Sequence, residues 1–251
     1  MSNRWLRIAI VFALIIGAVV VSKYRPSHVL HKVPFACQAP DGNWEDPRKQ
    51  DGCEETSIIM AVAAAIGPDT LLPDAVIAIQ NRLCWFEEQR FGSYIDTGVR
   101  ETLIMLKQHY SWESMDKDKR RPFAAYVGTP VVLGDSTDAR YAQGDVTIEG
   151  MKQDLADGYI LFVPIDARHL NHPYYKSPPL AHMILIIGYD DDEDVFIVND
   201  PGTRRGAGMH FACQKIFEVM ADYKAGSHIN GPDDTRTKAY IKFLLAKSNW
   251  I

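Results

Sequence analysis

The chain has 251 residues, of which 47% are hydrophobic and 24% charged, the composition of an ordinary globular protein with one large domain or two lobes. Its formal net charge of -5 gives no sign of nucleic-acid binding, and its four cysteines are too few for a disulfide framework. The sequence has no CxxC pair to indicate a zinc site.

The N-terminal segment has the pattern of a membrane-targeting element. An apolar run from Ile8 to Val21 is flanked by basic and aromatic residues, which extend it toward the roughly 20 residues that span a membrane. A cleaved secretory signal fits the same pattern, but no A-x-A type of site follows, which favours an uncleaved anchor. We expect an anchor and basic linker over residues 1–32 and a catalytic domain over residues 33–251. That domain would lie outside the cytoplasm of a bacterial-type cell, held at the membrane by a single N-terminal pass or, alternatively, secreted.

The rest of the chain predicts helices first and strands afterwards. Helices are expected at residues 53–66, 73–88, 96–109, 147–157 and 211–223, with Asp96 or Thr97 as the N-cap of the third. Strands are expected at residues 33–37, 159–165, 182–190, 195–200 and 239–245. The acidic sequence DDDED lacks the spacing of a calcium loop and reads as an exposed hairpin turn. This order indicates an α+β architecture, with a helical N-terminal part, a C-terminal antiparallel sheet and a cleft between them.

The stretch QDGCEETSIIMAVAAAIG, from Gln50 to Gly67, holds the first candidate for catalysis. Its Asp-Gly turn delivers Cys53 to the first turn of a helix that is apolar on nearly every side and is therefore buried. Unsatisfied backbone N–H groups and the positive end of the helix dipole favour a thiolate there. Taken alone, the pattern also fits a small buried hydrophobic residue.

Two later residues turn this pattern into that of a thiol enzyme. Thiol catalysis needs a histidine to accept the proton of the cysteine and a third group to orient the imidazole. His182 opens one buried strand and Asp200 ends the next, so a hairpin would bring their side chains together. Three residues at element ends that converge are more specific than any one of them.

Four segments carry a family resemblance. VPFACQAPDGNW, QDGCEETSIIMA, HMILIIGYD and VNDPGTRRG, in this order, resemble the bacteriocin-processing (double-glycine leader) cysteine peptidases and their stand-alone relatives. The resemblance covers residues 33–245 and implies a papain-like fold. It implies Cys53 as nucleophile, His182 as base and Asp200 as the orienting residue. It also implies that the amide of Gln38 stabilises the oxyanion. This chemistry needs no metal or organic cofactor.

Two features near the cysteine depart from the pattern of the family. Glu54 and Glu55 follow Cys53 where many relatives have Gly-Pro, and carboxylates beside a thiolate raise its pKa unless they point away. The gap from Gln38 to Cys53 is long, so Gln50 is a rival oxyanion donor.

Other polar residues have more than one interpretation. His169 and His172 are expected to line the cleft or face solvent. Arg204 and Arg205 form a basic surface turn or bind a carboxylate. Cys37 is either a small buried residue or the disulfide partner of Cys84 or Cys213.

The leading hypothesis is a membrane-anchored or secreted cysteine peptidase that hydrolyses bonds in a peptide or protein substrate. One alternative is a thiol-dependent amidase or acyl transferase acting on cell-wall peptides. The other is a binding module that has kept the fold without turnover. The membrane is the expected partner of the N-terminal helix, and no nucleic acid is expected to bind.

Overall fold

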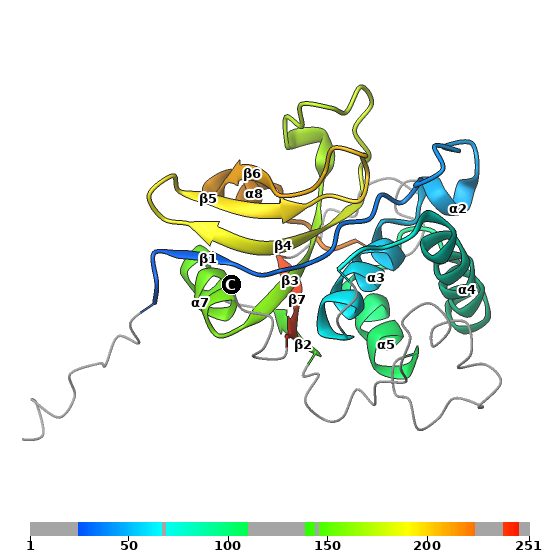
Figure 1. The fold of residues 1–251 in the computed structure, drawn as a ribbon, viewed down its shortest axis with the longest axis horizontal. Coiled ribbons are helices and arrows are strands. Elements are labelled where there is room, and N and C mark those ends of the chain that lie inside the picture. The colour runs from blue at the N-terminus through cyan, green and yellow to red at the C-terminus, as the bar shows by residue number, and fades with distance from the viewer. Residues whose placement is uncertain (1–24, 67–68, 110–138, 144–145, 224–237, 246–251) are drawn as a thin grey trace, which may run out of the picture.

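A single antiparallel sheet lies at the centre of the computed structural model, which describes residues 25–66, 69–109, 139–143, 146–223 and 238–245 (Figure 1). In this part of the chain the sheet has seven strands. Six of them follow the order β2-β7-β3-β4-β5-β6, and the seventh, β1, pairs with β4. Their bounds are β1 His28–Leu30, β2 Ala139–Gln143, β3 Tyr159–Ile165, β4 His182–Asp190, β5 Val195–Asn199, β6 Met209–Ala212 and β7 Ala239–Leu244.

Strand β4 is the central strand and carries the candidate base at its first position. On one side its first half pairs with β3, from His182 to Ile186, and its last three residues pair with β1. A Cβ at Gly188 would lie 2.2 Å from the carbonyl oxygen of Val29, so glycine allows β1 to approach. Eight of its nine residues are buried, as expected for a strand covered on both faces.

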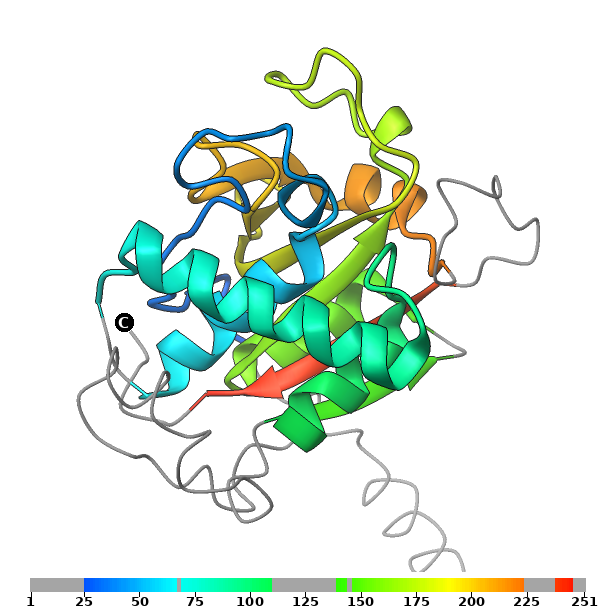
Figure 2. The same ribbon diagram turned by 90° about the vertical axis from the view of Figure 1, so that its right-hand side faces the viewer.

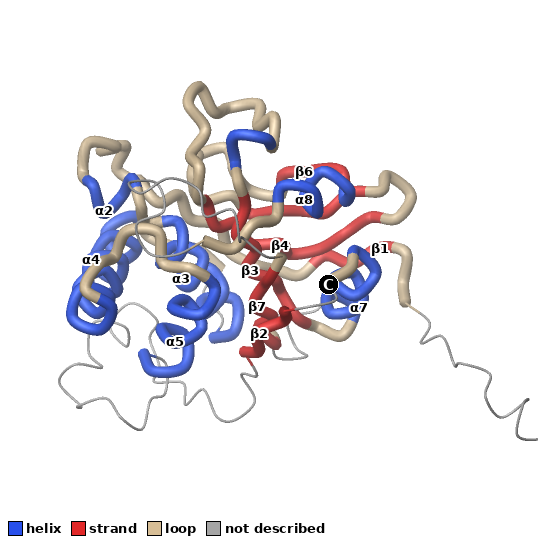
Figure 3. The backbone as a smooth tube through the Cα atoms, turned by 180° about the vertical axis from the view of Figure 1, so that it is seen from behind, coloured by secondary structure: helices blue, strands red, loops and turns tan. Residues whose placement is uncertain are grey.

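Helices cover both faces of the sheet (Figure 3). Helices α3, α4 and α5 gather on one side of the strands, and α7 and α8 lie on the other. Figure 2 shows α4 lying over α3. The bounds are α2 Pro47–Gln50, α3 Cys53–Ile66, α4 Pro73–Phe91, α5 Val99–His109, α7 Ile148–Ala156 and α8 Cys213–Val219, with a 3₁₀ turn at Ala167–His169.

Alternation along β4 divides the interior into two hydrophobic cores. Met183 and Leu185 belong to the core shared with α3, whereas Ile184 and Ile186 belong to the core shared with α7 and α8. The apolar residues of α3 fill the first of these cores, which holds the start of α3 rigidly beside the start of β4.

The main helices and strands confirm the predictions. The predictions are wrong in four places: residues 33–37, residues 211–223, β2 and the start of α5. The 33–37 segment forms no strand; instead β1 forms at His28–Leu30, within the expected linker, because it pairs with β4. The expected 211–223 helix is divided between β6 and α8, since pairing with β5 overrides helical periodicity up to Ala212. Strand β2 was not predicted.

Helix α5 begins at Val99, three residues later than predicted. The expected capping residue Thr97 instead donates its hydroxyl to Glu87 Oε1 at 2.8 Å. The backbone N–H of Val99 donates to Asp222 Oδ1 at 3.0 Å, so the start of the helix is capped from a distant part of the chain.

Among the described residues, no helix has both the length and the apolar character to cross a membrane. The expected anchor, from Ile8 to Val21, lies outside the described residues.

Candidate active site

Cys53 is the first residue of α3, and its sulfur lies beside the start of β4. The backbone N–H of Met183, the residue after His182, donates to Cys53 Sγ at 3.3 Å. The preceding Gly52 makes the tight approach to α3 possible, because a Cβ there would lie 1.8 Å from Gln80 Nε2. The cysteine is therefore held between a glycine turn and the strand that carries the candidate base.

His182 and Asp200 are in direct contact, as the hairpin predicted. His182 Nε2 lies 2.8 Å from Asp200 Oδ1, and both side chains are buried. The same carboxylate oxygen accepts the backbone N–H of Gly202 at 2.8 Å. Because Nε2 then carries the proton that Asp200 accepts, Nδ1 is the nitrogen left to act as a base.

Tyr175 and His172 surround this contact. The expectation that His172 lines the cleft or faces solvent is wrong, because its side chain is buried and is absent from the lining of the active-site cavity. The hydroxyl of Tyr175 donates to Asp200 Oδ1 at 2.7 Å and lies 3.0 Å from His182 Nε2. His172 Nε2 lies 3.3 Å from Asp200 Oδ2, and its ring stacks on Tyr175 with centroids 3.9 Å apart. His172 Nδ1 accepts the N–H of Tyr174, and its Nε2 lies 3.3 Å from Met209 Sδ as well as from Asp200 Oδ2.

These contacts keep Asp200 ionised. Burial by itself raises the pKa of its carboxyl group. The charge of His182 and the polar contacts of His172, His182 and Tyr175 outweigh burial, so the pKa of Asp200 falls well below its usual range. A permanent negative charge here stabilises an imidazolium at His182.

The candidate residues open onto one cavity of about 440 Å³. Cys53, His182 and Gln38 all line it, together with Trp44, Tyr175 and the 177–181 loop. Cys53 is 6% exposed and His182 is 2% exposed, so the reactive groups lie at the floor of the cavity.

Comparison with protein families decides the identity. The model of the Peptidase_C39 like family matches residues 30–227. The chain belongs to the Peptidase_C39 like family. It is therefore a cysteine peptidase, as the resemblance implied.

Similar solved structures include two peptidases. One is a C39-like peptidase from Bacillus anthracis, with 13% identity and a TM-score of 0.45, covering 87% of this chain and 98% of that one. The other is xylellain, a cysteine protease from Xylella fastidiosa, with 14% identity and a TM-score of 0.40, covering 89% and 88%. At these values neither similarity bears on the substrate. A comparison with curated proteins found no match.

Glu54 contacts the sulfur of Cys53 and opposes the thiolate that the start of a helix would otherwise favour. Cys53 Sγ donates to Glu54 Oε2 at 3.0 Å, and the hydroxyl of Tyr223 donates to Glu54 Oε1 at 2.7 Å. Burial, and then the charge of Glu54, raise the pKa of the Cys53 thiol well above its usual value. Burial also raises the pKa of Glu54. The expected thiolate is thus opposed by a carboxyl group that points at the sulfur.

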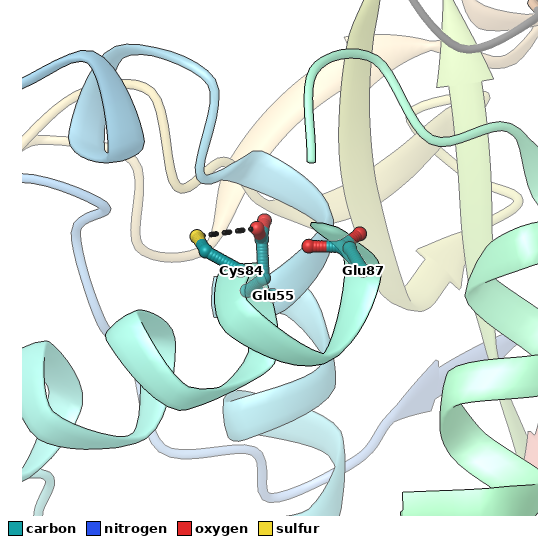
Figure 4. A group of neighbouring side chains, drawn as sticks. All are labelled: Glu55, Cys84 and Glu87. Carbon is teal, nitrogen blue, oxygen red and sulfur yellow. Dashed lines mark hydrogen bonds between the residues drawn. The ribbon is translucent and has the colours of Figure 1, made fainter. Parts of the chain in front are cut away.

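Glu55 lies in a buried cluster with Cys84 and Glu87 (Figure 4). The Cys84 thiol donates to Glu55 Oε1 at 3.0 Å. These three residues offer ligand atoms within 4.8 Å of one another, a spacing that suits a metal ion. Burial raises the pKa of all three groups, which opposes the deprotonation that metal binding requires. We therefore interpret the cluster as a buried polar contact between α3 and α4.

Gln38 lines the cavity, but its amide is already hydrogen-bonded. Its Nε2 donates to the carbonyl oxygens of Lys49 at 2.8 Å and Gln50 at 2.7 Å. Gln50, the rival donor, also lines the cavity and donates its Nε2 to the carbonyl of Trp44 at 2.6 Å. Both N–H groups of the Gln38 amide are therefore in use, whereas the bond to Trp44 takes only one of the two N–H groups of Gln50, so the oxyanion role of Gln38 stays a prediction.

The remaining candidates are placed as follows. His169 is exposed and lies 3.9 Å from Asp166, away from the cavity lining. Cys37, Cys53, Cys84 and Cys213 are all buried free thiols, so no disulfide joins them. No periodic signal could have marked Tyr175 and His172, because both lie in an irregular loop; the pattern HLNHPYY was the only indication of a packed polar loop.

Proposed function

We propose that the peptidase hydrolyses peptide bonds through a triad of Cys53, His182 and Asp200. The observation that carries the proposal is the 2.8 Å contact between His182 Nε2 and Asp200 Oδ1. His182 is the first residue of β4, and the backbone N–H of the next residue, Met183, donates to Cys53 Sγ. A nucleophile and a base at one cavity, with a buried carboxylate in contact with the base, are the parts that acyl transfer requires.

In the proposed mechanism His182 Nδ1 takes the proton of the Cys53 thiol, and the sulfur attacks the substrate carbonyl carbon. The imidazolium, stabilised by Asp200, then gives its proton to the leaving amine as the C–N bond breaks. A water molecule, deprotonated by His182, attacks the thioester; the acid product leaves and the thiol is restored.

The oxyanion would be held by the backbone N–H of Cys53 and the amide of Gln38. The first lies in the first turn of α3, where backbone N–H groups have no partner within the helix. The second requires the Gln38 amide to release one of its two backbone carbonyls when substrate binds.

The protonation state of Glu54 is proposed to control the stability of the Cys53 thiolate. Since Tyr223 donates to Oε1, the proton of a neutral Glu54 sits on Oε2 and points at Cys53 Sγ. A proton that moves from sulfur to His182 then leaves a thiolate beside either a neutral acid, which stabilises it, or a carboxylate, which does not.

Membrane anchoring through residues 1–32 is also a proposal. The support is the apolar run from Ile8 to Val21 with its basic and aromatic flanks. The full chain, expressed in bacteria, is expected to stay with membranes after an alkaline wash and to be released by detergent; release by the alkaline wash alone contradicts an integral anchor.

The proposed reaction is tested with the full chain and a Cys53→Ala variant, incubated with a peptide library in ¹⁸O-labelled water. New carboxyl termini that carry ¹⁸O, formed only by the wild type, support hydrolysis. New amides formed with an added amine, without labelled acids, would assign the enzyme to acyl transfer instead. Cleavage by Cys53→Ala would refute the role of this cysteine.

A further inference from the structure

A second hollow adjoins the catalytic cavity. It has a volume of about 400 Å³, and Trp44, Tyr175 and Gly202 line both spaces, so the two are neighbours. Beyond these shared residues the second hollow is lined by Tyr174, Thr203, Arg204 and Arg205. A peptide that crosses Cys53 has this hollow as a neighbouring place for one of its side chains or its end.

Two guanidinium groups give the hollow a positive charge, although the whole chain carries a net charge of -5. Both arginines are exposed, and among the described residues neither forms an ion pair. Within the part of the chain that the structure describes, the lining of the hollow contains no carboxylate. The positive charge is therefore available to a ligand.

Local contacts hold the two arginines in place. Arg204 donates from Nη2 to the carbonyl of Pro40 at 3.2 Å, and it packs so closely on Gly42 that a Cβ there would lie 2.6 Å from Nη2. Arg205 lies over the ring of Tyr174, with its Cζ 5.3 Å from the ring centroid. A guanidinium that is already positioned loses less side-chain entropy when it binds a carboxylate.

Aromatic side chains form the other walls. Trp44 is 37% exposed and Tyr174 is 45% exposed, which is unusual for large hydrophobic residues of this chain. Exposed aromatic rings beside guanidinium groups are typical of surfaces that bind peptides.

We propose that this hollow is a specificity subsite that binds a carboxylate of the peptide substrate. A guanidinium recognises a carboxylate through charge-assisted, often bidentate hydrogen bonds. The carboxylate comes either from a Glu or Asp side chain or from the C-terminus of the peptide. The inference rests on the proposed peptidase function, because it names a substrate class for the same cleft.

The test uses amidated peptides of one sequence in which Glu or Gln is placed in turn at each of three positions on either side of the cleaved bond. A further Gln peptide ends in a free carboxylate, so that it tests the C-terminus of the peptide as the source of the carboxylate. For the wild type we expect kcat/KM to be about tenfold higher for the Glu peptide at one position, or for the free-terminus peptide, with the preference reduced by high salt. The R204Q/R205Q variant is expected to lose this preference, and R204E/R205E to prefer Lys at that position.

The matched control is R90Q, which removes an exposed arginine at the end of α4, away from both hollows, and is expected to keep the preference. Binding of the same peptides to full-length Cys53→Ala, measured by fluorescence anisotropy, gives a readout that does not need turnover. Equal affinity and equal kcat/KM for Glu and Gln peptides, or a preference that survives in R204Q/R205Q, would overturn the proposal. If no peptide is cut while the carboxylate preference in binding persists, the proposed hydrolysis fails and the subsite stands.

Discussion

Replacing Glu54 by Gln is expected to make Cys53 more reactive at neutral pH. In the wild type a thiolate at Cys53 would lie 3.0 Å from Glu54 Oε2. At that separation two unit charges repel by about 5.5 kcal/mol at an effective dielectric constant of about 20. This is a ceiling, because protonation of Glu54 removes the repulsion. We expect at least tenfold faster alkylation at pH 7, equivalent to about 1.4 kcal/mol.

The assay is the rate of iodoacetamide labelling of Cys53 between pH 5 and 10, with the label located by peptide mass mapping. Since the Glu54 charge raises the pKa of the thiol, the variant should gain most at neutral pH and approach the wild type at high pH. Glu55→Gln is the matched control, because Glu55 points toward Cys84 and should give a smaller gain. Unchanged or slower labelling of Glu54→Gln would refute the reasoning and indicate that neutral Glu54 supports the thiolate.

Three further predictions concern the groups around the cavity. Tyr175→Phe removes the hydroxyl that donates to the ionised Asp200, and kcat should fall at least about tenfold, because a hydrogen bond to a charged group contributes about 1.5–3 kcal/mol; an unchanged kcat contradicts this role. Gln38→Ala should lower kcat by about 10²–10³-fold, and Gln50→Ala should lower it far less, as measured by steady-state kinetics. A larger fall in kcat for Gln50→Ala than for Gln38→Ala would assign the oxyanion hole to Gln50. Because its surroundings lower the pKa of Asp200, this carboxylate stabilises the fold above the unfolded-state pKa of about 4, and the contribution is lost as pH falls below that value. In urea unfolding, the difference in the free energy of unfolding between wild type and Asp200→Asn should be constant from pH 7 to 5 and should become smaller below pH 4. A difference that grows in acid contradicts the predicted loss of stability.

The elements that carry the candidate triad could be predicted because each is a long apolar run with a clear boundary. Helix α3 and strands β3 and β4 have the predicted limits, and the hairpin between β4 and β5 brings His182 to Asp200. The local sequence pattern predicts a helix or strand correctly when its apolar residues and their periodicity indicate the same structure.

The surroundings of the triad could not be predicted, because distant parts of the chain determine them. Glu54 points at Cys53 partly because Tyr223, far along the chain, donates to its other oxygen. His172 and Tyr175 belong to an irregular loop whose packing on Asp200 has no periodic signature. The shortened α5 and the division between β6 and α8 also follow from tertiary contacts, with Asp222 and with β5.

The most direct test of the central claim is stoichiometric inactivation of the full chain by a peptide-derived thiol alkylating agent, with cleavage of a peptide substrate as the readout. We expect that one equivalent of bound label abolishes cleavage and that mass mapping finds it on Cys53. Cys37, Cys84 and Cys213 should stay unlabelled, because Cys53 lines the catalytic cavity and these three residues are not among its lining residues. His182→Ala should slow this labelling strongly. Full activity in a protein whose Cys53 is completely labelled would contradict the assignment of Cys53 as the nucleophile.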